Sequence, residues 1–221
     1  MKADLTKIKI IAWDLDGTLF QSQKDLSIAM AGAFVKILSE SKNLNEDDAR
    51  KLLSESVAIH KGVTKSLEAL GCGDRISIIK RVESIVDKAS YLKVDQKLQK
   101  MFTDLSNYKH AIASDTSHTI INKELEALGL SSSIFESITG VDDAKTTKPD
   151  RMFYQVMLNK GNYNPSDYLV VGDRVAIDLI PAKELGMMTC LVWSNEVDPE
   201  RSRRADFVLP TVYNVADLFK E

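Results

Sequence analysis

The sequence predicts an α/β fold, with a doubly wound parallel sheet and a smaller all-helical domain inserted into it. Two patterns support this prediction. In residues 1–20 and 95–221, short apolar runs alternate with helical patterns, which is typical of parallel strands covered by helices on both faces. Residues 21–94 contain no convincing strand pattern and carry apolar residues at helical intervals. We therefore expect a Rossmann-like core of residues 1–20 and 95–221 and a helical cap of residues 21–94.

Six short runs rich in apolar residues are the expected strands of the core. They cover residues 8–12, 109–113, 134–140, 168–171, 189–193 and, most weakly, 207–209. The core helices expected with them cover residues 119–128, 150–160, 177–185 and 215–220. Ser117 or a neighbour would cap the first of these helices, and Gly129 and Gly186 would end two of them.

The inserted segment is expected to hold helices over residues 26–38, 46–57, 64–70 and 74–89, with Asn45 as an N-cap. The chain would cross between the two domains near residues 20–24 and 92–96. Because the insertion follows the first strand, the cap would lie above the carboxyl end of that strand as a lid.

The composition is that of a globular protein without a nucleic-acid or membrane signature. The chain has 221 residues and a net charge of −3, with no basic surplus. Arg201, Arg203 and Arg204 form a short basic cluster without aromatic residues, which we interpret as a solvated loop. No apolar run has membrane-spanning length, and no signal-peptide pattern is present. We expect a cytoplasmic protein whose two cysteines, Cys72 and Cys190, are free thiols.

Two carboxylates leave the end of the first expected strand in the sequence Asp14-Leu15-Asp16-Gly17-Thr18. Carboxylates crowded at the end of a buried strand are costly unless they are paired, and a hard cation is a common partner. Open α/β sheets bind their ligands at this same edge. The motif therefore indicates a metal-assisted site, and we expect that site to act on phosphate.

Three further signals follow in order, each at or just beyond the end of an expected strand. They are Ser114, the run Lys148-Pro149-Asp150, and the segment from Gly172-Asp173 to Asp178. Together with the first motif they resemble the haloacid dehalogenase-like hydrolase superfamily, most closely its phosphatases with a helical cap after the first core strand. The resemblance covers about residues 5–20 and 95–221, while the cap matches in place and size.

The resemblance and the chemistry of phosphate esters imply the same roles for these residues. Asp14 would be the nucleophile, and Asp16 would protonate the leaving oxygen and later deprotonate water. Mg²⁺ would be bound by Asp14, the backbone carbonyl of Asp16 and Asp173. Lys148 would neutralise charge on Asp14 and on the phosphoryl group. The remaining expected site residues are Ser114 and Asp115 for phosphate binding and Asp178 as an outer-shell carboxylate.

Simpler interpretations remain open for several of these residues. Ser114 can be a plain helix cap, and Asp178 can be an acid at a helix start that only complements the helix dipole. Lys148 can be a solvated lysine, with Lys145 as a rival candidate. Substrate specificity would come from the cap, with His60 and Lys61 as the best local candidates, and from Arg174. The simpler interpretations are a solvated helix start for His60 and Lys61, which the pattern favours, and a salt bridge to a nearby acid for Arg174. Further cap candidates are Gln21, Gln23, Lys65 and Arg75.

The expected function is Mg²⁺-dependent hydrolysis of a small phosphate monoester through an aspartyl phosphate. The enzyme would resemble a phosphoglycolate phosphatase and would act on a small phosphorylated metabolite. True dehalogenases of this superfamily lack a carboxylate at the position of Asp16, so its presence argues for phosphoryl transfer. An intramolecular sugar phosphomutase and a non-catalytic protein that binds a phosphorylated metabolite are the alternatives. The sequence does not distinguish a monomer from a homodimer.

Overall fold

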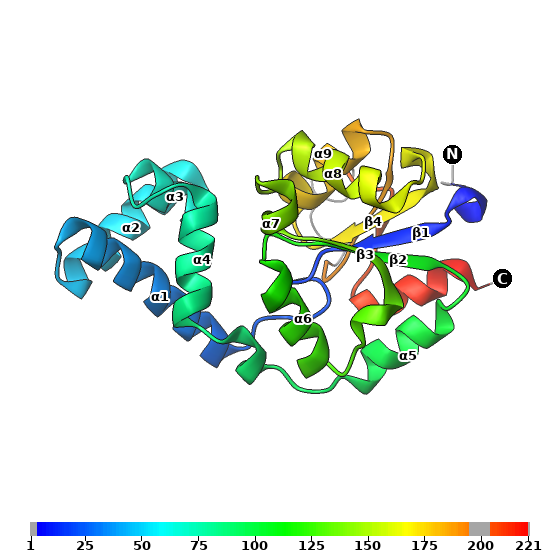
Figure 1. Cartoon of the computed structure of the whole chain (residues 1–221), viewed down its shortest axis with the longest axis horizontal. Helices are drawn as coiled ribbons and strands as arrows, with labels where there is room; N and C mark the ends of the chain where they lie inside the picture. The colour runs from blue at the N-terminus through cyan, green and yellow to red at the C-terminus, as the bar shows by residue number, and fades with distance from the viewer. Residues whose placement is uncertain (1–3, 195–203, 221) are drawn as a thin grey trace. The chain divides into compact units, whose positions relative to one another are not determined.

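A computed structural model describes residues 4–194 and 204–220. The chain divides into two compact units (Figure 1), and we describe each by itself. Unit 1 consists of residues 1–21 and 93–221, and unit 2 consists of residues 22–92. Arg201 and Arg203 of the expected basic loop lie outside the described residues.

Unit 1 is built on a six-stranded sheet in the order β3-β2-β1-β4-β5-β6, in which every neighbouring pair is parallel. The strands are β1 (Ile10–Trp13), β2 (Lys109–Ala113), β3 (Phe135–Thr139), β4 (Tyr168–Gly172), β5 (Met188–Leu191) and β6 (Phe207–Val208). β1 lies between β2 and β4, which is where the strand order reverses direction. Ligands of open α/β sheets bind at such a position. The predicted fold class is confirmed.

Helices cover both faces of this sheet. They are α5 (Gln96–Asp104), α6 (His118–Ala127), α7 (Val141–Ala144), α8 (Arg151–Gly161) and α9 (Ile180–Glu184). Figure 1 shows α8 and α9 on one face of the sheet and α5 and α6 on the other. Short 3₁₀ segments complete the unit: Leu5–Lys7, Ser132–Ile134, Pro165–Asp167 and the longer Val212–Phe219.

Alternate residues of β1 enter two different cores because successive side chains of a strand point to opposite faces. Ile10 and Ala12 belong to the core that also contains Phe153 and Tyr154 of α8. On the other face, the ring of Trp13 lies 5.3 Å from that of Phe102 in α5, in an edge-to-face arrangement. All four β1 residues are fully buried, and the strand begins and ends later than the expected range of residues 8–12.

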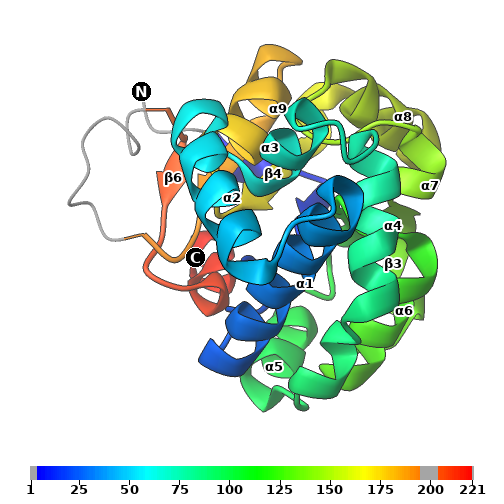
Figure 2. The ribbon, with the colours of Figure 1, turned by 90° about the vertical axis from the view of Figure 1, so that its left-hand side faces the viewer.

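Unit 2 is helical throughout. Its elements are α1 (Lys24–Lys42), α2 (Glu46–His60), α3 (Val63–Ala69), α4 (Arg75–Ile85) and a 3₁₀ turn, Lys88–Tyr91. Figure 2 shows these helices packed together, with α1 in contact with α2 and α4. The side chain of Asn45 accepts a hydrogen bond from the amide of Asp48 at 2.9 Å, so the expected N-cap of α2 is confirmed.

Several parts of unit 1 differ from the expected helices. The short helix α7 was not expected, and the helix expected over residues 215–220 is the 3₁₀ segment Val212–Phe219. No helix was expected over α5, whose side chains are largely polar and whose apolar contacts come mainly from Leu98, Met101 and Phe102. The helix expected over residues 177–185 begins instead as a π-helical turn, Val175–Leu179, that continues into α9. Pro181 explains part of this irregularity, because it has no amide hydrogen to donate to the carbonyl four residues earlier.

Two other observations concern the thiols and the membrane. Cys72 and Cys190 are free and buried, as expected. Within residues 4–194 and 204–220, no helix combines the length and apolar character that crossing a membrane requires.

Candidate active site

The sequence motifs meet at the carboxyl edge of the sheet. Asp14 directly follows β1, Ser114 follows β2 and Asp173 follows β4. The amide of Asp14 donates to the carbonyl of Val171 at 2.9 Å, which continues the pairing of β1 with β4 beyond the strand. Parallel pairing therefore brings residues from three distant segments to one edge, because the carboxyl ends of parallel strands coincide.

Gly17 allows the chain after Asp14 to turn close to Asp173. Its φ of +86° lies in the left-handed region, which side chains with a Cβ rarely adopt. A Cβ built on Gly17 would lie 2.7 Å from Oδ2 of Asp173. The absence of a side chain at position 17 is thus what lets the backbone approach this carboxylate.

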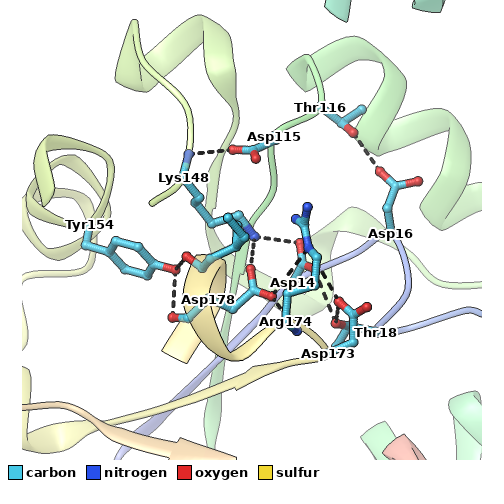
Figure 3. A network of polar contacts seen from close by, with 11 residues as sticks. Asp14, Asp16, Thr18, Asp115, Thr116, Lys148, Tyr154, Asp173, Arg174 and Asp178 are labelled. Carbon is cyan, nitrogen blue, oxygen red and sulfur yellow. Dashed lines mark hydrogen bonds and ion pairs between the residues drawn. The ribbon is translucent and has the colours of Figure 1, made fainter. Parts of the chain in front are cut away.

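Lys148 joins two buried carboxylates (Figure 3). Its Nζ donates to Oδ1 of Asp14 at 2.7 Å and to Oδ1 of Asp178 at 2.6 Å, and its side chain is 1% exposed. Its backbone amide donates to Oδ1 of Asp115 at 2.7 Å, which fixes the loop before α8. The alternative of a solvated Lys148 is wrong, whereas the rival Lys145 is exposed.

Burial dominates the electrostatics of these groups. It raises the pKa of Asp14 to about 7, although the charge of Lys148 opposes this rise. Burial also raises the pKa values of Asp115 and Asp173. For Lys148, burial alone would lower the pKa, but Asp14 and Asp178 raise it well above its usual value. Lys148 is therefore a fixed ammonium beside Asp14, whose carboxyl group burial makes harder to ionise.

Asp178 is held in place from two sides. Its Oδ2 accepts from the backbone amide of Arg174 at 3.0 Å, while Oδ1 binds Lys148. Its own carbonyl accepts from the buried hydroxyl of Tyr154 at 2.8 Å, and the carbonyl of Ile177 lies 3.2 Å from the same hydroxyl. Tyr154 thus donates towards two carbonyls of the π-helical turn, and one of them, that of Ile177, lies four residues before Pro181. Asp178 is more than an acid at a helix start, because its buried carboxylate orients Lys148.

Asp16 points away from the pair formed by Asp14 and Lys148. Its Oδ2 accepts a hydrogen bond from the hydroxyl of Thr116 at 2.8 Å. The hydroxyl of Thr18 lies 3.3 Å from Oδ2 of Asp14 and 3.4 Å from Oδ1 of Asp173. The two acids of the first motif therefore have separate surroundings, which suits two different roles.

The hydroxyl of Ser114 is buried and has no hydrogen-bond partner within the part of the chain that the structure describes. The alternative of a helix cap is wrong for Ser114, because the N-cap position of α6 is occupied by Ser117. A buried hydroxyl without a partner is costly unless a ligand satisfies it. Its position after β2 suits an anion bound at the sheet edge.

Three carboxylates fit a divalent cation. Among the described residues, oxygens of Asp14, Asp173 and Asp178 lie within 4.8 Å of one another. A set of oxygen donors with surplus negative charge suits a hard cation such as Mg²⁺. Both oxygens of Asp178 already accept hydrogen bonds, so Asp14 and Asp173 are the better candidate ligands. Oδ2 of Asp16 accepts from Thr116, and the backbone carbonyl of Asp16 as a metal ligand stays a prediction.

The expected specificity residues are divided between the two units. The side chain of Arg174 is 47% exposed, with Nε 3.9 Å from Oδ1 of Asp173 and 3.8 Å from Oδ2 of Asp178. His60 ends α2 and Lys61 follows it with a φ of 57°, and both are exposed in unit 2. A role for His60 and Lys61 in binding substrate remains a prediction.

Sequence reasoning missed three residues of the network in Figure 3, namely Thr18, Thr116 and Tyr154. Thr18 belongs to the first motif and Thr116 lies two residues after Ser114. Their short distance in sequence from the expected site residues could have identified them. Tyr154 lies in the middle of a helix at a position that looks like ordinary core, and no local pattern identifies it.

Several known proteins are similar to this chain over most of its length. A glyceraldehyde 3-phosphate phosphatase of Methanocaldococcus jannaschii is 25% identical over 239 residues, covering 96% of this chain and 97% of that protein. A phosphoglycolate phosphatase of Vibrio cholerae is 26% identical, with 92% and 93% covered. The crystal structure of a HAD phosphatase from Thermococcus onnurineus superposes with a TM-score of 0.69 at 18% identity, covering 96% of this chain and 98% of that one.

A match to a family model shows the family of this protein. The model of the haloacid dehalogenase-like hydrolases matches residues 11–192, a span that begins in β1 and ends just after β5. It contains every residue of the network around Asp14 and Lys148, and it exceeds half of the chain. The protein belongs to the haloacid dehalogenase-like hydrolase family.

Proposed function

We propose that this protein is a Mg²⁺-dependent phosphatase of small phosphate monoesters that works through an aspartyl phosphate. The observation that carries the proposal is the buried contact of Lys148 Nζ with Asp14 Oδ1 at 2.7 Å. A carboxylate beside a fixed ammonium is suited to attack a dianionic phosphate, because the positive charge offsets the repulsion between the two anions.

In the first step, a carboxylate oxygen of Asp14 forms a bond to phosphorus while the bond from phosphorus to the ester oxygen breaks. The ester oxygen takes a proton from Asp16 and leaves as an alcohol. Lys148 stays close to Asp14 throughout, because Asp178 holds its ammonium from the other side. The hydroxyl of Ser114 donates to an oxygen of the phosphoryl group.

In the second step, Asp16 accepts a proton from a water molecule, which attacks phosphorus and displaces the carboxylate of Asp14. The products are inorganic phosphate and the regenerated Asp14. Thr116 keeps the carboxylate of Asp16 oriented during both transfers through its 2.8 Å hydrogen bond. When bound, Mg²⁺ supplies positive charge that neutralises the phosphoryl oxygens and favours the ionised form of Asp14.

The presence of Asp16 supports phosphoryl transfer over dehalogenation. A halide needs no proton to leave, whereas an alkoxide does. The two relatives named above are phosphatases of small phosphorylated compounds, and both align over more than nine tenths of this chain. We therefore propose phosphorylated two- and three-carbon metabolites as the first substrates to examine.

The test is phosphate release from a panel of small esters, with Mg²⁺ and with EDTA. The panel contains phosphoglycolate, glyceraldehyde 3-phosphate, sugar phosphates, nucleotides and p-nitrophenyl phosphate, and Asp14→Asn is the control enzyme. We expect release that requires Mg²⁺ and is absent in the control. Isomerised sugar phosphate without net release would instead indicate a mutase. Binding without any turnover would indicate a protein that only holds a phosphorylated metabolite.

A further inference from the structure

Trp193 has an unusual backbone conformation at the carboxyl edge of the sheet. It follows β5 by two residues and has a φ of 57°, in the left-handed region. Bulky side chains seldom adopt this conformation, and strained residues cluster at functional sites. The half-buried Trp193 is therefore held in place by contacts that outweigh its backbone preference.

One such contact reaches the loop that carries Asp14. The indole Nε1 of Trp193 donates a hydrogen bond of 2.8 Å to the backbone carbonyl of Thr18. The hydroxyl of the same threonine lies 3.3 Å from Asp14 and 3.4 Å from Asp173. Trp193 thus fixes the backbone of the residue whose side chain spans the two candidate metal ligands.

A second contact holds the indole ring against Tyr213. The rings of Trp193 and Tyr213 meet edge to face, with centroids 5.7 Å apart. The hydroxyl of Tyr213 donates to Oδ2 of Asp95 at 2.7 Å. Oδ1 of Asp95 caps α5 by accepting from the amides of Lys97 and Leu98. The indole is therefore tied to the rigid start of a helix.

We propose that Trp193 is a positioning residue for phosphoryl transfer. Through the carbonyl of Thr18 it holds the loop from Asp14 to Thr18 in the arrangement that the transition state needs. This proposal rests on the proposed phosphatase function. We assign the positioning to the hydrogen bond and not to the bulk of the ring, because it is the N–H group that contacts the carbonyl of Thr18.

The first test replaces the donor and keeps an aromatic ring. Trp193→Phe retains packing against Tyr213 but cannot bond to Thr18. We expect kcat to fall roughly tenfold, as for the loss of one well-placed hydrogen bond, with KM changed by less than about twofold. Tyr213→Phe keeps both rings and removes the anchor to Asp95, and a smaller loss of kcat is expected.

The matched control for Tyr213→Phe is Tyr163→Phe, which removes another tyrosine hydroxyl from a carboxylate. Tyr163 donates to Oε2 of Glu136 at 3.4 Å, away from the site, and we expect its variant to keep wild-type kcat. Equal kcat values for the Tyr213 and Tyr163 variants would overturn the role of the anchor. If Trp193→Phe fails to fold, Trp193→Leu is the second variant, because it also lacks the N–H group that donates to Thr18. The same loss of kcat is expected, and wild-type kcat in this variant would overturn the proposal.

A binding measurement separates positioning from a general structural role. Calorimetric titrations with orthovanadate and with inorganic phosphate, both with Mg²⁺, compare a mimic of the transition state with a ground-state ligand. We expect Trp193→Phe to weaken vanadate binding roughly tenfold and phosphate binding by less than about twofold. Equal weakening of both ligands, or no change in either, would overturn the proposal.

These measurements distinguish failure of the role proposed for Trp193 from failure of the proposed phosphatase function. If wild-type protein hydrolyses esters while Trp193→Phe matches its kcat, Trp193 is not a positioning residue and the phosphatase function stands. If wild-type protein hydrolyses no ester in the panel, the phosphatase function fails. The difference between vanadate and phosphate binding, which needs no turnover, then decides the role of Trp193.

Discussion

Lys148 Nζ lies 2.7 Å from Asp14 Oδ1 although 134 residues separate them in the chain. Neither side chain is more than 4% exposed. A charge buried to this degree is stable only with its partner, because desolvation of a single ion costs several kcal/mol. Stability therefore depends on this pair, to which we also assign the central role in the proposed reaction.

We expect Lys148→Met to lower the free energy of unfolding by about 3 kcal/mol or more at pH 8, because it leaves Asp14 and Asp178 buried without their cation. Urea denaturation measures this change. The matched control is Lys109→Met, which removes a lysine that is 63% exposed and 3.4 Å from Glu136. Its cost should stay below about 1 kcal/mol. Equal costs for the two variants would contradict the importance of the buried pair.

Asp16→Asn tests the proposed roles of Asp14 as the nucleophile and Asp16 as the acid and base. p-Nitrophenolate is a good leaving group, so its departure depends little on an acid, whereas attack by water still needs a base. We expect a burst of nearly one equivalent of p-nitrophenolate, followed by steady turnover at least about 100-fold slower than in the wild type. Stopped-flow absorbance measures both phases. Slow turnover without a burst would show that the first step has become rate-limiting, which contradicts the expectation that Asp16→Asn mainly slows attack by water.

Gly17→Ala tests the close approach of the Asp14 loop to Asp173. The new methyl group would lie 2.7 Å from Oδ2 of Asp173, and φ would stay at +86°. We expect a loss of kcat of more than about tenfold and a higher Mg²⁺ concentration at half-maximal activity, because Asp173 must move. A metal titration of activity measures both effects.

Gly32→Ala is the matched control for Gly17→Ala. A Cβ at Gly32, within α1, meets nothing within 4 Å. Alanine should therefore stabilise unit 2 by about 0.5–1 kcal/mol through its higher helix propensity. Urea denaturation checks this value. A destabilised Gly32→Ala variant, or a Gly17→Ala variant with unchanged metal dependence, would contradict the steric explanation.

His110 makes stability depend on pH. It is buried in β2, and its Nδ1 accepts a hydrogen bond from the indole of Trp13 at 3.2 Å. Burial lowers the pKa of His110 from 6.5 to about 4. Between these two values the unfolded chain binds a proton that the folded chain does not. The contribution of His110 is therefore complete above about pH 6.5 and is lost as the pH falls towards 4.

The loss amounts to up to about 3 kcal/mol for a shift of this size. Urea denaturation at several pH values between 4 and 7 measures it. His110→Gln cannot titrate and should show a shallower decline in stability over this range. Parallel pH profiles for the wild type and the variant would contradict the lowered pKa.

The sheet edge was predictable because motif position and strand position coincide in this fold. Asp14, Ser114 and Asp173 each follow an apolar run, and parallel pairing places the ends of such runs together. Lys148 was harder to predict, because it lies in a loop with no periodic pattern. Its burial follows only from the partners that Asp14 and Asp178 provide.

Other features depend on contacts that no local pattern encodes. The indole of Trp193 reaches Thr18 across 175 positions of sequence, and its run looks like an ordinary strand. The hydroxyl of Tyr154 stabilises a π-helical turn that was expected to be α-helical. The helix α5 was not predicted because it is short and carries few apolar residues among many polar ones, although Asp95 is a good N-cap.

The central claim is that Asp14 becomes phosphorylated during turnover. The most direct measurement is a rapid acid quench of enzyme mixed with a radiolabelled phosphate ester and Mg²⁺, followed by peptide mapping. We expect the label on the peptide that contains Asp14 in the wild type and no label in Asp14→Asn. Release of phosphate by the wild type without labelled protein, or substantial turnover by Asp14→Asn, would contradict the covalent mechanism.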